Sequence, residues 1–174
     1  MSEVRGPDNA QEREAAFERL VEDYQAVLLR TCFLYLKDQA LAEDAVQETF
    51  VKAYRHMEAF RGECSERTWL VKIAINVCRD LKRSAWFRFT DRHVTPDMLP
   101  EPAAPCSPQD EELTAAVLRL PVKLRETVLM YYYHGMTVSD MAKTLGISQS
   151  SVSGRLQRAR GKLRDALEGR ESHA

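Results

Sequence analysis

The sequence predicts an all-α fold in which two small helical domains are joined by a proline-rich, acidic linker. The 174-residue chain has only seven glycines, and long stretches of it are rich in Ala, Leu, Glu, Lys, Arg and Gln, which favour helices. Five of its seven prolines fall within residues 94–110, a segment without Lys or Arg. Such a composition cannot build a core. It therefore divides the chain into domains 10–88 and 110–170, with residues 89–109 as a flexible linker.

The first domain is expected to contain three amphipathic helices. Apolar residues recur at intervals of three and four over residues 10–36 and again over residues 40–57, which is the spacing of one buried helix face. A loop that turns at Gly62 follows, because glycine tolerates turn conformations that other residues avoid. Ser65 is then placed to cap a third helix that ends near Arg83.

The second of these helices carries an unusual surface patch. Opposite its apolar side, Val51 is framed by acids and an amide. An exposed valine surrounded by acidic and amide side chains is typical of a surface that docks on another protein. An ordinary solvated helix surface is an equally good interpretation of this pattern alone.

The third helix has a different polar pattern on the side away from its apolar stripe. Residues 67–93 contain seven Lys or Arg against two Asp or Glu. A line of cations with an amide and a tryptophan can neutralise phosphates and contact unpaired bases. A core tryptophan beside a solvated basic face is the alternative. The line consists of Trp69, Lys72, Asn76, Arg79 and Arg83.

The second domain is predicted to end in a helix-turn-helix. Thr137 can cap a short helix, with Asp140 as its capping-box partner. Gly146 can adopt the positive φ that a sharp turn between helices needs, and Ser148 can cap the helix that follows. Residues 143–164 contain six Lys or Arg and no Asp or Glu. This pattern predicts a DNA-reading module whose recognition helix begins at Ser148.

Composition and motifs exclude several other classes of protein. No run approaches the roughly 18 apolar residues of a membrane span, and the N-terminal MSEVRGPDNAQERE is no signal peptide, so a cytoplasmic protein is expected. The four cysteines lack the paired spacing of a zinc site, and neither metal nor cofactor is expected. The sequence has no Gly-rich phosphate loop and no nucleophile elbow, so no catalytic residue and no enzyme is predicted.

Taken together, the motifs resemble those of a known family. They are LAEDAVQETFVKAYRHMEAFRG, SERTWLVKIAINVCRDLKR and LPVKLRETVLMYYYHGMTVSDMAKTLGISQSSVSGRLQRARGKLR, in this order. Over residues 15–88 and 110–167 the chain resembles bacterial RNA polymerase sigma factors, specifically the extracytoplasmic-function (ECF) group. The short segment 89–109 leaves no room for a helical middle domain, which suits that group. The resemblance implies promoter recognition, DNA strand opening and transcription initiation.

The resemblance also implies roles for the polar faces of the first domain. The segment that docks on the clamp helices of the polymerase's largest subunit matches Asp44, Gln47, Glu48, Val51 and Tyr54. The loop that captures a base flipped out of the minus-10 element matches Phe60, Arg61, Gly62 and Glu63. The helix that holds the separated strand matches Trp69, Asn76, Arg79, Asp80, Lys82 and Arg83, with Lys72 on the same face.

The second domain matches the part of the family that reads the minus-35 element in the major groove. On the exposed side of its recognition helix, Ser153, Gln157 and Arg158 are expected to contact base edges. Gly154 would permit close approach of the backbone to DNA. The predicted minus-35 residues are Lys143, Ser151, Ser153, Gly154, Arg155, Gln157, Arg158 and Arg160, of which Lys143, Arg155 and Arg160 are expected to contact phosphates.

The partners that the resemblance implies are core RNA polymerase, promoter DNA and an anti-sigma factor. On the polymerase, the contacts implied are the clamp helices and the flap of the second-largest subunit. A stand-alone dimeric helix-turn-helix regulator is the alternative function. That alternative accounts for the pattern of residues 121–167 but gives no function to the two polar faces of the first domain.

Overall fold

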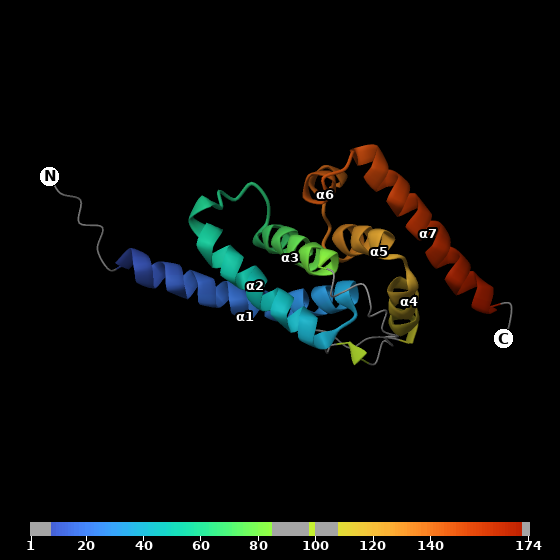
Figure 1. Cartoon of the computed structure of the whole chain (residues 1–174), viewed down its shortest axis with the longest axis horizontal. Coiled ribbons are helices and arrows are strands. Elements are labelled where there is room, and N and C mark those ends of the chain that lie inside the picture. The colour runs from blue at the N-terminus through green and yellow to red at the C-terminus, as the bar shows by residue number, and fades with distance from the viewer. Residues whose placement is uncertain (1–7, 85–97, 100–107, 172–174) are drawn as a thin grey trace.

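The computed structural model describes residues 8–84, 98–99 and 108–171 (Figure 1). Within these ranges the chain forms helices and turns and no strand, so the predicted all-α fold class is confirmed. Most of the predicted linker, residues 89–97 and 100–107, lies outside the described residues. None of the described helices combines the length and the apolar character needed to cross a membrane.

The first domain consists of α1 (Asp8–Leu36), α2 (Gln39–His56), the 3-10 turn η1 (Met57–Ala59) and α3 (Glu66–Arg83). Lys37 turns the chain after α1 with a φ of +59°. Asp38 then caps α2 by accepting a hydrogen bond from the Leu41 amide at 3.0 Å. Ser65 caps α3 as predicted, because its Oγ accepts a hydrogen bond from the Thr68 amide at 3.1 Å.

The second domain consists of α4 (Pro108–Arg119), α5 (Val122–Val128), the π-helical turn η4 (Leu129–Tyr133), α6 (Val138–Leu145) and α7 (Gln149–Glu171). The predicted helix-turn-helix is confirmed. Thr137 Oγ1 accepts a hydrogen bond from the Asp140 amide at 3.0 Å and donates one to the Asp140 carboxylate at 2.8 Å. Gly146 ends α6 with a φ of +66°, and Ser148 Oγ accepts a hydrogen bond from the Ser151 amide.

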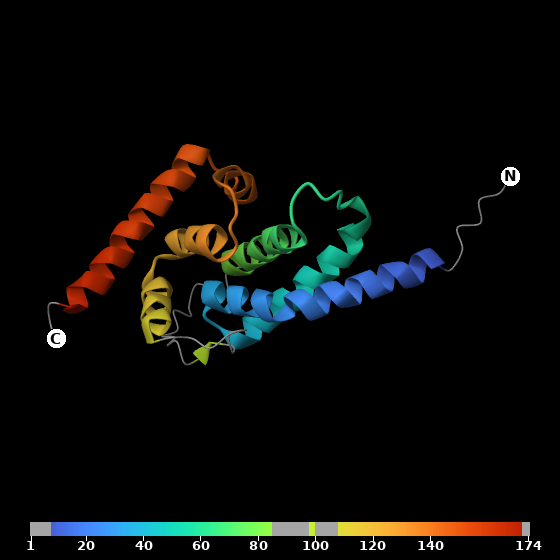
Figure 2. The ribbon, with the colours of Figure 1, turned by 180° about the vertical axis from the view of Figure 1, so that it is seen from behind.

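The two domains pack against each other. In both ribbon views α3 lies beside α6, and α5 lies beside the end of α1 (Figures 1 and 2). The larger of two clusters of buried apolar side chains spans both domains and includes Leu28 and Cys32 of α1 together with Met130 and Met141 of the second domain. The sequence predicted two domains, but it did not predict this contact between them.

α3 is buried on more sides than its sequence pattern suggests. Leu70 and Ala74 are buried on the predicted apolar stripe. Val71, Ile75 and Cys78 on a neighbouring side are buried as well. This extra burial arises because α3 contacts α1, α2 and α6 together. A helix covered from three directions shows a broader apolar surface than one helix face.

Candidate nucleic-acid and partner-binding surfaces

The predicted docking face lies on the exposed side of α2. All five of its predicted residues are exposed, and Val51 and Tyr54 are 43% and 41% exposed respectively. Large apolar side chains with this exposure are candidates for contact with another protein when they lie beside further apolar surface. The docking face consists of Asp44, Gln47, Glu48, Val51 and Tyr54.

A groove between α1 and α2 adjoins this docking face. Its volume is about 780 Å³, and its wall includes Phe17, Phe50, Val51 and Tyr54. Edge-to-face contact with the Phe17 ring, at 4.9 Å between centroids, fixes the Tyr54 ring. The Arg13 guanidinium also lies 4.5 Å from the centre of that ring. The groove is therefore a preformed apolar surface with a polar rim.

The loop before α3 brings two of the predicted minus-10 residues together. The rings of Phe60 and Trp69 stack with 4.7 Å between centroids and 22° between planes. Both side chains are partly exposed, whereas Arg61, Gly62 and Glu63 are exposed. Gly62 has a φ of +71°, which a residue with a Cβ rarely adopts. The pair forms an aromatic platform of the kind on which a nucleic-acid base can stack.

The structure divides the predicted line of residues on α3 into two groups. Asn76, Asp80 and Arg83 are exposed, and Asp80 lies 3.6 Å from Arg83 in an ion pair across one turn. Lys82 is partly buried. Asn76, Asp80 and Arg83 are therefore accessible from solvent.

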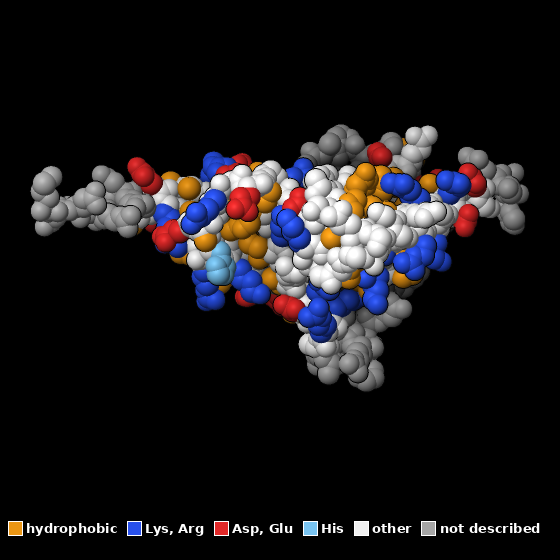
Figure 3. Space-filling view, turned by 90° about the horizontal axis from the view of Figure 1, so that it is seen from above, with side chains coloured by type: hydrophobic (Ala, Val, Ile, Leu, Met, Phe, Trp, Pro, Cys, Tyr) orange, Lys and Arg blue, Asp and Glu red, His pale blue; other side chains and the backbone are white. Residues whose placement is uncertain are grey.

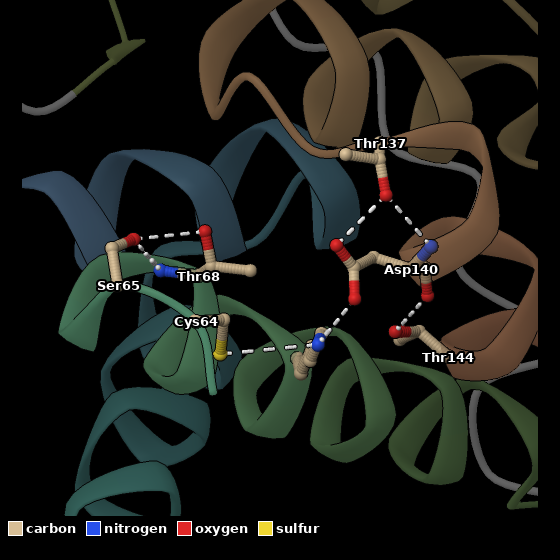
Figure 4. A network of polar contacts seen from close by, with 7 residues as sticks. Cys64, Ser65, Thr68, Thr137, Asp140 and Thr144 are labelled. Atoms are coloured by element: carbon tan, nitrogen blue, oxygen red, sulfur yellow. Dashed lines mark hydrogen bonds and ion pairs between the residues drawn. The ribbon is translucent and has the colours of Figure 1, made fainter. Parts of the chain in front are cut away.

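Lys72 and Arg79, by contrast, contact the second domain. Lys72 Nζ lies 2.8 Å from Asp140 Oδ1. The same carboxylate accepts a hydrogen bond from Thr137 Oγ1 (Figure 4). Arg79 Nη1 donates a hydrogen bond to the Thr144 carbonyl at 3.2 Å. The hydrogen bond from Lys72, with a further one from Thr137, lowers the pKa of the Asp140 carboxyl. Two predicted DNA contacts are thus engaged with α6 in this conformation.

The predicted minus-35 residues lie on α7 and at the end of α6. Buried Val152, Leu156 and Ala159 orient the opposite side of α7 towards solvent. The exposed minus-35 residues are Lys143, Ser151, Ser153, Gln157, Arg158 and Arg160. In the view from above, Lys and Arg side chains lie over both halves of the molecule (Figure 3).

Two of the arginines on α7 have partners in the second domain. Arg155 Nη1 lies 2.8 Å from Glu126 Oε1, and the Glu126 side chain is 5% exposed. Arg160 Nε donates a hydrogen bond to the Tyr132 hydroxyl at 2.6 Å. Gly154 is partly exposed, and a Cβ there would meet no atom within 4 Å. Arg155 therefore has a structural contact that the sequence did not predict.

Sequence reasoning also missed several polar groups that lie between the domains. Glu126 accepts a hydrogen bond from the Tyr35 hydroxyl at 2.8 Å, and burial followed by the charge of Glu126 raises the pKa of Tyr35. His134 is 7% exposed and contacts residues of α1 and α3. No local pattern marks these pairs, because their partners are distant in the sequence.

Metal binding finds no support in the described part of the chain. No group of three or more His, Cys, Asp or Glu side chains lies close enough to hold a metal ion. The described cysteines, Cys32, Cys64 and Cys78, are free thiols.

Comparison with known proteins identifies two matching families. Residues 20–88 match Sigma-70 region 2, and residues 110–163 match Sigma-70 region 4. The chain is 33% identical over 162 residues to the ECF RNA polymerase sigma factor SigL of Mycobacterium tuberculosis (strain H37Rv), across 89% of this chain and 91% of SigL. It is 29% identical over 167 residues to the RNA polymerase sigma-H factor of Pseudomonas aeruginosa, across 88% of this chain and 86% of that protein.

Two solved structures share the fold. CnrH in complex with the cytosolic domain of CnrY matches with a TM-score of 0.63 and 27% identity, over 92% of this chain and 94% of CnrH. The sigma factor RpoE in complex with the anti-sigma factor NepR from Bartonella quintana matches with a TM-score of 0.68 and 22% identity, over 88% of this chain and 97% of RpoE. At 22% identity, the similarity to RpoE shows a shared fold only.

Proposed function

Because this chain belongs to the sigma-70 family, in the ECF group of RNA polymerase sigma factors, we propose that it directs core polymerase to promoters and opens the DNA there. One observation carries this proposal. The two family regions follow one another in a single chain, and each presents an exposed polar face on a rigid helical support. The protein supplies recognition and strand opening, and the polymerase supplies the chemistry.

The proposed division of labour follows the two domains. Residues 10–88 dock on polymerase and melt the minus-10 element, and residues 110–170 read the minus-35 element. Residues 89–109 link them. The coincidence of these boundaries with the two matched regions, 20–88 and 110–163, supports this assignment.

The docking face on α2 is the proposed contact with the clamp helices of the polymerase's largest subunit. Its support is the exposed Val51 and Tyr54 beside an apolar groove, with Asp44, Gln47 and Glu48 around them. An apolar centre with a polar rim is the usual anatomy of a protein interface. The second domain is proposed to contact the flap of the second-largest subunit.

The loop and the exposed side of α3 are the proposed minus-10 contact. Phe60 and Trp69 supply a stacking surface for a flipped base, with Arg61, Gly62 and Glu63 around it. The strand leaving that surface would follow α3. The residues proposed along it are Lys72, Asn76, Arg79, Asp80, Lys82 and Arg83.

The exposed side of α7 is the proposed minus-35 contact. Ser153, Gln157 and Arg158 are exposed on the recognition helix, where they can reach base edges in the major groove. Lys143, Arg155 and Arg160 are the proposed phosphate contacts, although Arg155 is also paired with Glu126 in this conformation. Ser151 lies beside them as a further proposed DNA contact. Gly154 lets the helix approach the DNA.

An anti-sigma factor is a further proposed partner. Its support is that CnrH, a solved structure similar to this chain at 27% identity, is in complex with the cytosolic domain of another protein, CnrY. The proposed place of action is the cytoplasm, where bacterial RNA polymerase works. No catalytic residue and no cofactor is assigned.

Run-off transcription with purified core polymerase on a promoter library tests the proposal. Addition of the chain should produce transcripts from a defined subset of templates that share two elements at fixed spacing. The alternative, a stand-alone dimeric regulator, predicts another result. A chain that never binds core polymerase and protects a palindrome as a dimer would refute the sigma-factor proposal.

A further inference from the structure

α6 covers part of the side of α3 that is proposed to hold the separated DNA strand. The ion pair between Lys72 and Asp140 is 2.8 Å long, and both side chains are little more than one quarter exposed. Arg79 is held by a backbone carbonyl of α6, that of Thr144. A phosphate group of a bound strand would have to replace these contacts. The packed arrangement therefore competes with strand binding at two cations.

The contact between the domains is fastened beside this site by His134, which follows η4. Its Nε2 lies 2.9 Å from Thr31 Oγ1 of α1, and its Nδ1 lies 3.3 Å from Arg67 Nε of α3. Arg67 Nη2 also donates to the Tyr133 carbonyl at 2.9 Å. One imidazole thus joins the second domain to two helices of the first.

The hydrogen bonds around His134 assign the position of its proton. Thr31 Oγ1 donates its own hydrogen to the Val27 carbonyl at 2.7 Å, so it accepts from His134 Nε2–H. Arg67 Nε–H can only donate, so His134 Nδ1 is the acceptor. The imidazole is therefore neutral. A second proton would have to bind at Nδ1, where it would meet the Arg67 N–H and its positive charge.

The groups around the imidazole do not compensate a positive charge. From α1 it faces the uncharged Thr31 hydroxyl, and from α3 it faces the Arg67 guanidinium. The carboxylate of Asp140 at the start of α6 is bound by Lys72 and Thr137. Burial and, after it, the charge of Arg67 lower the pKa of His134 to about 4. The packed arrangement consequently favours neutral histidine.

We propose that neutral His134 latches a closed state of the free protein, in which α6 covers Lys72 and Arg79, and that protonation of His134 opens the two domains. The latch rests on the observed packing. Its consequence for DNA, that opening frees two strand-binding cations, rests on the proposed function. Binding of polymerase or DNA would shift the same equilibrium towards the open state.

Proton linkage gives the size of the effect. An imidazole released into solvent has an ordinary pKa of 6.5, against about 4 in the closed state. The open state therefore binds more protons between these two pH values. The equilibrium constant for closing should fall about 30-fold between about pH 7.5 and about pH 5.

Single-molecule energy transfer in the full chain tests the latch. Fluorophores are placed through unnatural amino acids at the exposed positions Ala40 of α2 and Glu168 of α7. The closing constant is measured at both pH values in the native chain and in an Asp140→Asn background, in which weaker closure populates both states. The His134→Gln variant is the matched control, because glutamine keeps one donor and one acceptor but does not titrate.

The expected result is a roughly 30-fold loss of closure in chains with His134 and a pH-independent constant in chains with His134→Gln. Circular dichroism confirms that each variant is folded. An equal fall in both chains, or no fall in a chain with a populated open state, overturns the latch. Binding of a mixed-sequence single-stranded oligodeoxynucleotide is measured in parallel. If the chain opens but binds this probe no better, the latch stands and the proposed strand role of Lys72 and Arg79 fails.

Discussion

At the scale of single residues, Arg155 and Arg158 show how neighbours on one helix serve different purposes. Arg155 lies beside the buried carboxylate of Glu126, and its side chain is 16% exposed. Arg158 is exposed, and its Nε donates to the Gly154 carbonyl one turn earlier on the same helix. The first arginine compensates a buried charge, and the second is available to DNA.

Alanine substitutions should separate these two roles. Arg155→Ala should lower the free energy of unfolding by about 3 kcal/mol, because it removes a partner from a buried charge. Arg158→Ala should change that free energy by less than about 0.5 kcal/mol but weaken promoter binding by about 1–3 kcal/mol at one base position. Urea unfolding and competition binding on point-substituted minus-35 sites measure the two effects. Equal stability losses in both variants would contradict this assignment.

Asn76 permits a clean test of strand opening, because it is exposed on α3 and has no role in the core. Asn76→Ala should reduce the permanganate reactivity of unpaired thymines about five-fold, the effect of losing one hydrogen bond of about 1 kcal/mol. A template with a mismatched, already open minus-10 element serves as the control and should restore transcription. An unchanged permanganate pattern would show that this face does not hold the strand.

At the scale of elements, the helix-turn-helix was predictable because its determinants are local. The cap at Thr137, the turn at Gly146 and the cap at Ser148 each involve contacts within a few residues. The contacts of His134 with Thr31 and Arg67 span 103 and 67 residues. No periodicity in the sequence reports such contacts, which explains why the exposed faces were predicted and the interface between the domains was not.

Two glycines of this motif should respond in opposite ways to alanine. Gly146→Ala forces a Cβ into the left-handed region at a φ of +66° and should destabilise the chain by about 1–2 kcal/mol. Gly154→Ala lies inside α7 with open space around it and should stabilise the chain by about 0.8–1 kcal/mol. Thermal unfolding distinguishes the two. If Gly154→Ala also leaves minus-35 affinity unchanged, close approach of this backbone to DNA is ruled out.

The docking face on α2 makes an element-scale prediction as well. Val51→Glu should weaken binding to core polymerase by roughly 10- to 100-fold, because it places a charge at the apolar centre of an interface. Ala40→Glu is the matched control, since Ala40 is also exposed on α2 but lies outside the docking face. Fluorescence anisotropy with labelled chain measures both. A similar loss in both variants would remove the special role of Val51.

At the scale of the whole molecule, the shared core couples the domains. The Tyr35 hydroxyl of α1 reaches Glu126 of α5, and Arg125 Nη2 donates to the Tyr35 carbonyl at 2.9 Å. These contacts place two buried charged residues, Arg125 and Glu126, at the boundary between domains. Residues of the second domain therefore contribute to the stability of the first.

Removal of one hydroxyl tests this coupling. Tyr35→Phe should destabilise the full chain by about 1.5–3 kcal/mol, because a buried carboxylate loses a donor. Tyr24→Phe is the matched control, since its hydroxyl lies 3.5 Å from Glu66, a partner already bound by Arg19. Its effect should stay below about 0.5 kcal/mol. Chemical unfolding followed by tryptophan fluorescence compares the two variants.

The ion pair between Lys72 and Asp140 also bears on how promoter affinity varies with ionic strength. A lysine that moves from solvent to a phosphate displaces condensed cations from the DNA, and each such contact steepens the decline of affinity with salt. Before it binds DNA, Lys72 is already paired with the carboxylate of Asp140 and does not come from solvent. Salt weakens that starting contact too, so the two effects oppose each other. The salt dependence of promoter binding should therefore be shallower than the number of phosphate contacts alone would give, and it should steepen when Asp140 is replaced by asparagine.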